Sequence, residues 1–198
     1  MTDPIPASVR ETLSLPRSDA VASPPAGKWV RFVDRPTDPA SDPLRFEMWL
    51  APDGHGPMLH VHPEQEEGLA VVSGTLGVRV RDESRTLGPG EEAVVPAGVP
   101  HRFWNAGEDA LHLSGWVDPG LRTEAFMRVT YGLARDGAPV TPSGAPLNPL
   151  RLAALLAAYD DMLWLARVPE RLQRRCVGLV APLARAVGYG DDYPEYLG

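Results

Sequence analysis

The sequence has little cysteine, little lysine and no long hydrophobic run. Its one cysteine, Cys176, has no second cysteine with which to form a disulfide inside the chain, so the fold does not depend on an oxidising compartment. No stretch approaches the roughly 18 apolar residues that a membrane helix needs. Residues 1–15 also lack the apolar segment of a signal peptide. We therefore expect a cytoplasmic protein without a membrane partner.

The chain also has no excess of positive charge. The chain carries 26 acidic and 19 basic residues, which gives a net charge of −7, and Lys28 is its one lysine. A nucleic-acid partner requires a clustered basic surface, so the charge argues against that class of protein. The 198 residues, of which 43% are hydrophobic and 23% charged, are typical of a globular protein. This length suffices for one domain with a core and a helical appendage.

Residues 28–118 consist of short β-type runs separated by clusters of Gly, Pro and Asp. Short strands at this spacing are typical of an antiparallel all-β sandwich or barrel. The predicted strands are Lys28–Asp34, Leu44–Ala51, Met58–His62, Leu69–Ser73, Leu76–Arg81, Ser84–Leu87, Ala93–Val95, His101–Trp104 and Leu111–Val117. Residues 1–27 are rich in Pro, Ser and Asp and predict an irregular arm, with a short helix near Ser8–Leu13.

Residues 119–198 change to a helical pattern and form a predicted C-terminal extension. Apolar residues at helical spacing predict a first helix over Leu121–Arg135. After a linker rich in Pro and Gly, Asn148 looks like an N-cap, and the second helix would run to about Ala166. A third helix would run from Pro169 to about Val187, kinked or split at Pro182, with an irregular tail behind it.

Three histidines and a glutamate form the pattern that carries chemistry. His60 and His62 lie two residues apart in a strand-like run, and such side chains point to the same face of a strand. Glu67 opens the next apolar run, and His101 follows a Pro-Ala-Gly turn on a distant strand. Three imidazoles and one carboxylate suit a divalent transition metal. On a six-coordinate ion they leave two positions open, as catalytic sites require.

Both segments resemble the two sequence motifs of the cupins. The first runs from Gly54 through five residues to His60-Val61-His62, then four residues, Glu67, six residues and Gly74. The second runs from Gly90 through five residues to Pro96-Ala97-Gly98, then two residues, His101, three residues and Asn105. The resemblance implies a mainly β fold, an antiparallel cupin barrel (a double-stranded β-helix or jelly roll) followed by C-terminal α-helices. It also implies one divalent metal, Fe, Mn, Ni, Cu or Zn, held by His60, His62, Glu67 and His101. Dimers are common among cupins, so a homodimer is plausible.

The carboxylate ligand has a competitor in the neighbouring residue. Glu67 fits the six-residue step to Gly74, whereas Glu66 would face solvent on the opposite side of the strand. Strand alternation predicts that the cavity is lined by Met58, Leu69, Val71 and Phe103. The phase of the last strand is not fixed by the sequence, so His112 either faces the cavity as an acid or base, or faces away.

The reaction is left open among three classes. The leading hypothesis is an oxygenase or dioxygenase, an oxidoreductase acting on a small organic molecule, in which Glu67 could leave the metal and serve as a base. The alternatives are a metal-dependent isomerase, lyase or decarboxylase and a non-catalytic small-molecule-binding module. The C-terminal helices could pack on the barrel or on a partner subunit, form a lid over the barrel mouth, or lie on a membrane surface, the last disfavoured by the net acidity.

Overall fold

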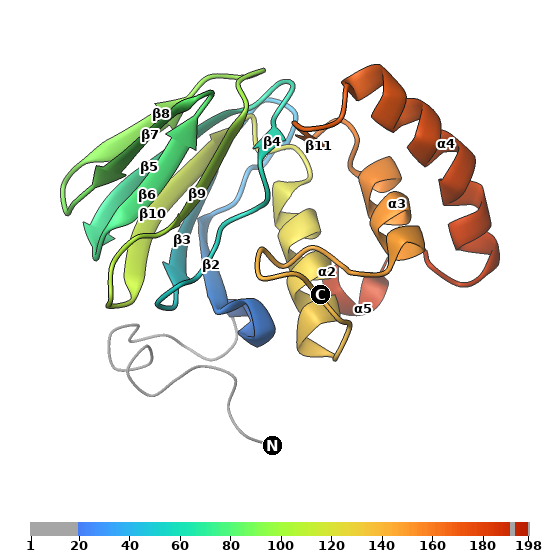
Figure 1. The fold of residues 1–198 in the computed structure, drawn as a ribbon, viewed down its shortest axis with the longest axis horizontal. Coiled ribbons are helices and arrows are strands. Elements are labelled where there is room, and N and C mark those ends of the chain that lie inside the picture. The colour runs from blue at the N-terminus through green and yellow to red at the C-terminus, as the bar shows by residue number, and fades with distance from the viewer. Residues whose placement is uncertain (1–19, 191–192, 198) are drawn as a thin grey trace.

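Two antiparallel sheets lie face to face in the computed structural model, which describes residues 20–190 and 193–197 (Figure 1). The first sheet has the order β1-β2-β3-β10-β5-β8, with strands at Ala20–Ser23, Lys28–Asp34, Leu44–Leu50, Leu111–Asp118, Glu66–Ser73 and Glu92–Val95. The second has the order β11-β4-β9-β6-β7, with strands at Trp164–Leu165, His60–Val61, His101–Asn105, Leu76–Val80 and Glu83–Leu87. The mainly β, antiparallel architecture predicted from the sequence is confirmed.

Alternation along the strands creates the core between the sheets. In β10, Leu111 and Leu113 are fully buried, whereas His112 between them and Ser114 after them are more exposed. Their antiparallel partners on β3, Leu50 and Met48, are buried on the same face, so that this face of the sheet is apolar. The core lies between the inner faces of the two sheets. Its largest fully buried side chains include Phe46, Met48, Leu50, Leu69 and Leu76.

Two strands lie outside the range predicted for the barrel. β1 pairs with β2 through residues that the sequence predicted to be irregular, and a 3-10 turn at Pro24–Ala26 joins the two strands. β11 comes from the C-terminal region and pairs with β4, where Leu165 is the register partner of His60. The barrel is therefore completed by chain segments from both sides of residues 28–118. The predicted helix at Ser8–Leu13 lies outside the described residues.

Within the described residues, four α-helices gather on one side of the two sheets (Figure 1). They are α2 at Thr123–Arg135, α3 at Pro149–Ala158, α4 at Glu170–Ala186 and α5 at Pro194–Leu197. A second apolar cluster, which includes Val129, Leu155 and Met162, packs α2 against α3. None of the helices described here combines the length and the apolar composition that a bilayer crossing requires.

The helix ends show where local sequence signals succeed and where tertiary contacts override them. The Asn148 cap is confirmed, because its side-chain oxygen accepts hydrogen bonds from the backbone N–H groups of Leu150 and Arg151, at 3.0 and 3.1 Å. However, α3 ends at Ala158 rather than near Ala166, because the chain turns there and then pairs with β4 as β11. α4 continues through Pro182 without a break in its assignment, and α5 forms in the tail predicted to be irregular.

Candidate metal centre

Three neighbouring strands position the four predicted ligands. His60 lies on β4 and His101 on β9, and the two residues are direct register partners in the antiparallel pair. His62 follows β4, and Glu67 lies on β5 of the facing sheet. The site therefore bridges the two sheets, and the strand pairing that holds His60 beside His101 explains why residues 41 positions apart in the sequence (101 − 60) meet.

The four side chains converge in the interior. Their exposed fractions are 1% for His60, 6% for His62, 4% for Glu67 and 2% for His101. One ligand atom from each lies within 4.8 Å of all the others. His60 Nε2 and His62 Nε2 are 3.1 Å apart, and His101 Nε2 is 2.9 Å from Glu67 Oε2. These residues could bind a metal ion together.

Backbone carbonyls fix the orientation of all three imidazoles. The Nδ1 atoms of His60, His62 and His101 lie 2.8, 2.7 and 2.8 Å from the carbonyl oxygens of Met58, Met162 and Val99. A carbonyl can only accept, so each Nδ1 carries the hydrogen and donates it. The three Nε2 atoms then present free lone pairs to the interior when the rings are neutral, and such outer hydrogen bonds are the usual support of metal-ligating histidines.

The close approach of His60 and His62 tests whether a metal fits. With both Nδ1 atoms protonated, neutral rings point two lone pairs at each other across 3.1 Å, an arrangement that needs a cation or a proton between them. Two ligand atoms that each lie about 2.1 Å from one ion are separated by roughly 3 Å when they occupy adjacent octahedral positions. The separations of 3.1 and 2.9 Å match that value. The residues present therefore fit a divalent transition metal.

The pKa directions of His60, His62 and Glu67 favour the protonation states that metal binding needs, whereas the pKa of His101 is raised, because the hydrogen bond and charge of Glu67 outweigh burial. Burial, reinforced by repulsion from His101 and His62, holds the pKa of His60 well below its usual value. Burial also lowers the pKa of His62, although the Glu67 carboxylate opposes it. Burial alone would raise the pKa of Glu67, but the hydrogen bond and charge of His101, with a smaller effect of His62, outweigh it and lower the pKa. Neutral imidazoles and an ionised carboxylate are the ligand forms of these residues.

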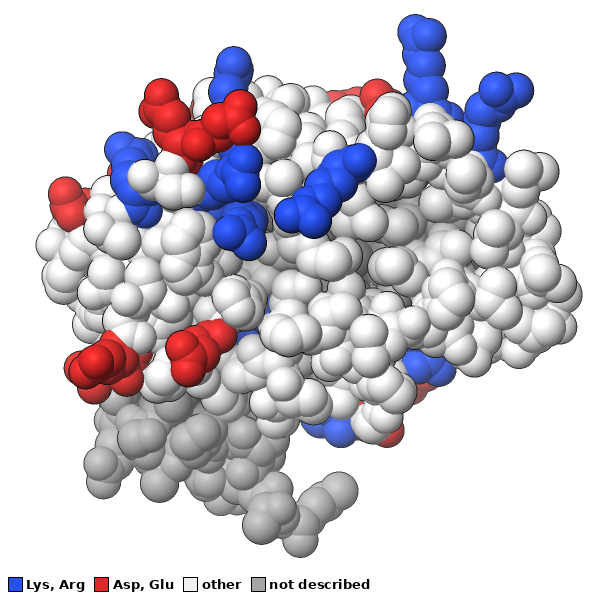
Figure 2. Space-filling model, viewed as in Figure 1, with Lys and Arg blue, Asp and Glu red and all other residues white. Residues whose placement is uncertain are grey.

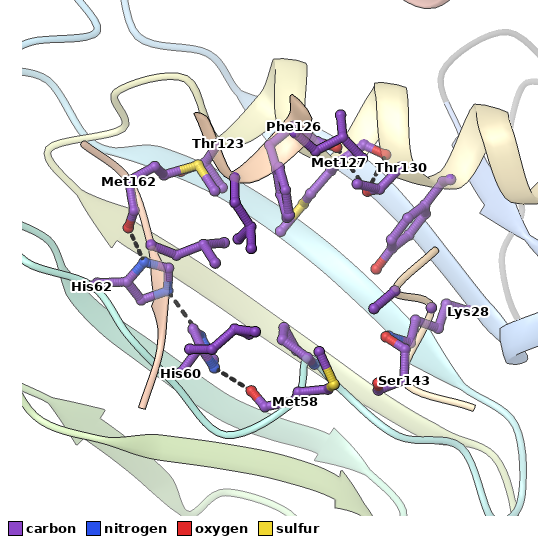
Figure 3. Close-up of a pocket in the computed structure, with 18 of the residues that line it drawn as sticks. Lys28, Met58, His60, His62, Thr123, Phe126, Met127, Thr130, Ser143 and Met162 are labelled. Atoms are coloured by element: carbon purple, nitrogen blue, oxygen red, sulfur yellow. Dashed lines mark hydrogen bonds between the residues drawn. The ribbon is translucent and has the colours of Figure 1, made fainter. Parts of the chain in front are cut away.

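A cavity of about 100 Å³ extends from this cluster toward the helices. Figure 3 shows His60 and His62 at one end and Lys28 with Ser143 at the other. The wall between them is mostly apolar, and its members are Met48, Met58, Phe103, Val117, Phe126, Met127, Leu152, Leu155, Leu156, Met162, Leu163 and Leu165. More than half of these come from the C-terminal region, so the helices close the cavity from the side opposite the sheets.

The sequence-predicted cavity residues are only partly brought together. Met58 and Phe103 line the cavity. Leu69 and Val71 share the inner face of β5 with Glu67 but lie further along the strand, where they fill the core between the sheets instead of the cavity wall. His112 faces away, because Leu111 and Leu113 on either side of it point inward.

The outward placement of His112 removes it from the acid and base groups of the cavity. Its ring stacks on Trp49 with centroids 4.4 Å apart, and its Nε2 lies 3.6 Å from a Glu47 carboxylate oxygen. Of the two adjacent glutamates, Glu67 is buried and Glu66 is exposed, which agrees with the choice of Glu67 from its six-residue step to Gly74.

Several cavity residues escaped the sequence prediction. Lys28 and Tyr131 line it, although they were assigned to strand and helix without a role. Ser143 to Pro146, which the sequence predicted as part of a linker, also contribute. The one available signal was that Lys28 is the only lysine of the chain. Met162 supplies a backbone carbonyl, for which no side-chain pattern exists.

Comparisons with known proteins agree with this architecture. Residues 46–117 match the family model described as Cupin domain. Among solved structures, the chain is similar to an RmlC-like cupin from Shewanella frigidimarina, with 17% identity and a TM-score of 0.45 over 53% of this chain and 87% of that one. It is also similar to the TT1209 protein from Thermus thermophilus, with 27% identity and a TM-score of 0.38 over 44% and 83% of the two chains.

A further similar structure is the cupin domain of Cnp3 from Schizosaccharomyces pombe, with 12% identity and a TM-score of 0.41 over 46% of this chain. The present chain spans 64% of that protein, less than two thirds of its length. No curated protein matches the chain.

Proposed function

Since this chain is a member of the cupin superfamily through its domain at residues 46–117, we propose that it is a metal-dependent enzyme, an oxygenase acting on a small and largely apolar organic molecule. The observation that carries the proposal is the convergence of three Nε2 atoms, each held by a carbonyl behind its ring, with the Glu67 carboxylate at one end of an apolar cavity. His60, His62, Glu67 and His101 would hold the metal, which is one of Fe, Mn, Ni, Cu or Zn.

The donor set supports a catalytic site more than a structural one. A redox-active divalent metal bound there would supply Lewis acidity and a binding position for dioxygen. Structural sites close their shell with protein ligands, whereas here His60, His62 and Glu67 border a cavity. Room for a small molecule therefore lies directly beside the ligand atoms.

The protein's own contribution is orientation, charge balance and exclusion of water. The carbonyls of Met58, Met162 and Val99 hold the rings, and the Glu67 carboxylate offsets part of the positive charge. Glu67 is also the candidate base, because it is the one carboxylate among the residues that line the cavity in the described structure. Apolar side chains from α2 and α3 exclude bulk water, which strengthens the electrostatic interactions inside.

Oxygen uptake by metal-loaded protein tests the proposal. The purified chain would be stripped, reloaded separately with Fe(II), Mn(II), Ni(II), Cu(II) and Zn(II), and analysed for metal content. Oxygen consumption would then be followed with a panel of small carboxylic acids, enols and phenols. We expect uptake with at least one redox-active metal, and neither metal nor uptake in His101→Ala. Glu66→Gln, which alters an exposed neighbour of Glu67, should leave both unchanged.

The same experiment separates the alternatives. Substrate loss that persists without oxygen and with Zn(II) would replace the oxygenase by a Lewis-acid isomerase, lyase or decarboxylase. Tight binding without chemical change by any metal form would identify a non-catalytic binding module. The homodimer stays a prediction, which light scattering of the full chain tests.

A further inference from the structure

We propose that Lys28 binds the carboxylate group of a small organic acid at the end of the cavity opposite the metal centre. The proposal rests on the proposed function in one respect, since it assigns the substrate class of the same cavity. It places the acidic group of the substrate at Lys28 and leaves the apolar body to extend toward His60 and His62 (Figure 3).

Lys28 is a buried amine that points into this cavity. It begins β2 and is 2% exposed. Its Nζ donates one hydrogen bond, to the carbonyl oxygen of Ser143 at 2.6 Å, and lies 6.0 Å from the centre of the Tyr131 ring. An ammonium group has three donors, so the Ser143 carbonyl uses only one of them.

The charge of Lys28 has no protein counterion in the described part of the chain. None of the ion pairs among residues 20–190 and 193–197 includes it. Burial lowers its pKa from 10.5 to about 7, which reflects the cost of an unpaired cation in an apolar site. A buried lysine without a carboxylate is rare in proteins, and a carboxylate brought in by a ligand would offset that cost.

The loop beside Lys28 is built to keep the amine uncovered. Thr141 and Ser143 share a hydrogen bond between their hydroxyl groups at 2.9 Å, and Gly144 follows with a φ of +82°. A Cβ atom at Gly144 would lie 3.3 Å from Lys28 Nζ, so a side chain there would crowd the amine. The loop thus presents a carbonyl to one side of the ammonium group without enclosing it.

A second hollow next to the cavity carries positive charge. It measures about 360 Å³, shares Met58, Phe103 and Ser143 with the cavity, and has no acidic residue among its described lining. Its polar lining includes Arg79, Arg102 and Arg167.

Part of that charge is balanced locally. Arg79 pairs with Asp82, whose carboxylate is almost fully exposed, and Arg102 lies over the Trp104 ring, but the hollow stays basic in a chain of net charge −7. Figure 2 shows basic side chains at the rim of a hollow near the centre of the molecular face that it depicts. Anions would therefore be attracted to the hollow beside the cavity that Lys28 lines.

The cavity volume limits the acid to a small one. A dry apolar cavity of about 150 Å³ is known to accommodate benzene, so a cavity of about 100 Å³ holds at most a molecule of that size, roughly six non-hydrogen atoms. A phosphate ester with an organic body would exceed this size, whereas acids of three or four carbons fit. Four methionines in the wall, Met48, Met58, Met127 and Met162, can adapt to different carbon skeletons.

The single lysine allows a direct test on the unaltered protein. Protein labelled with ¹³C-lysine gives one side-chain Cε signal, whose pH titration reports Lys28 alone. The zinc-loaded full chain would be titrated without ligand, with propanoate, butanoate or 2-methylpropanoate, and with the corresponding amides. We expect a midpoint near 7 without ligand, a rise of at least about one pH unit with one or more of the acids, and no rise with the amides. Unchanged midpoints with all three acids, or equal shifts with acids and amides, would overturn the proposal.

A matched pair of variants provides a second measurement. Lys28→Met removes the amine with little change in volume, and Met48→Leu alters the same cavity without changing a charge. By calorimetry at pH 6.5, we expect Lys28→Met to lose at least about tenfold in affinity for the best acid and to lose the preference for acid over amide, while Met48→Leu keeps that preference. An acid preference retained by Lys28→Met would also overturn the proposal.

Failure of this proposal is distinguishable from failure of the proposed function. Metal content of the wild type and of Lys28→Met is measured in the same samples, and Lys28 does not belong to the metal cluster. If both proteins bind metal but no acid shifts the titration midpoint of Lys28, only the acid site is wrong. If the acids shift the lysine signal in a protein that takes up no metal, the acid site stands and the metal-dependent enzyme does not.

Discussion

His62 donates a hydrogen bond through its Nδ1 atom to the backbone oxygen of Met162, 2.7 Å away and 100 residues further along the chain. The contact joins the barrel to the segment between α3 and α4. Beyond Leu163 in the same segment, Trp164 and Leu165 pair with β4 as β11. The C-terminal region therefore orients a predicted metal ligand as well as closing the cavity.

We predict that Gln173→Leu weakens metal binding although Gln173 lies in α4 and touches none of the four candidate ligands. Its side-chain oxygen accepts the Leu165 N–H at 3.1 Å and so attaches β11 to α4. Loss of that acceptor loosens β11 and the Met162 carbonyl behind His62. Substitution of groups that orient metal ligands typically weakens metal binding about 10- to 100-fold. The affinity for the metal should therefore fall about tenfold in Gln173→Leu, measured by competition with a chelator. Gln173→Glu, which keeps an acceptor oxygen, should lose less, and equal losses in both variants would contradict this reasoning.

The two adjacent glutamates provide a sharp comparison. Glu67→Gln removes the one carboxylate of the cluster, and we expect metal affinity to fall at least about 100-fold because the amide is a poorer donor and leaves the site with an extra positive charge. Glu66→Gln should stay within about twofold of the wild type, since that side chain is exposed. Chelator competition measures both, and metal analysis after dialysis provides a check. A larger effect from Glu66 would reverse the assignment of the carboxylate.

Lys28 should make stability depend on pH in the alkaline range. Its pKa is about 7 in the folded chain and 10.5 when solvated, so between these values the unfolded state binds more protons and stability rises with pH. The change is at most about 1.4 kcal/mol per pH unit from one group. The titratable group facing the amine from α2 is Tyr131, whose pKa is raised by burial, so Tyr131 stays neutral throughout this range.

Lys28→Met isolates that contribution. Urea unfolding of wild type and variant at pH 6, 8 and 9.5, in buffers free of carboxylates, should show the variant more stable at pH 6. The advantage should shrink toward pH 9.5 as the wild-type amine loses its proton. A difference between the two proteins that is constant across this range would mean that the amine is not desolvated in the folded state.

Gly56 controls the position of a cavity wall residue. A Cβ atom there would lie 2.6 to 2.8 Å from three ring atoms of Phe103, which is buried and must shift. Gly56→Ala should therefore destabilise the fold by about 1–3 kcal/mol and weaken binding of ligands that fill the cavity. Gly178 in α4 is the matched control, because a Cβ atom there meets nothing within 4 Å. Gly178→Ala should stabilise by about 0.5–1 kcal/mol in the same thermal or urea unfolding assay.

The strands and the candidate ligands were predictable because their signals are local. His60 and His62 lie two residues apart, although β4 covers only His60–Val61 of the predicted strand Met58–His62. Glu67 lies at a fixed step from Gly74, and the Asn148 cap acts on its own helix. Each of these signals concerns residues that are close in the sequence. The alternation argument failed for Leu69 and Val71 because it identifies the inner face of a strand but not the position along that face where the core ends and the cavity begins.

The parts that escaped prediction depend on long-range contacts. β11 has two residues, too few to carry a periodic pattern, and it exists because β4 offers an edge. Lys28 is buried through the loop at Ser143, which is 115 residues away, and a solvated lysine would have the same sequence context. The end of α3 at Ala158 likewise follows from the pairing of β11, since the residues beyond it continue to look helical.

The hydrogen bond from His62 to Met162 also bears on the order of events during synthesis. All four candidate ligands and the last long strand, β10, precede Met162 in the chain and are synthesised before it. Until then, the Nδ1 atom of His62 has no carbonyl partner from the helical layer, and the edge of β4 that β11 occupies is open. Stable binding of an ion would accordingly wait until synthesis has passed Met162, so that a nascent chain holding only the barrel segment is a poor competitor for scarce metal in the cell.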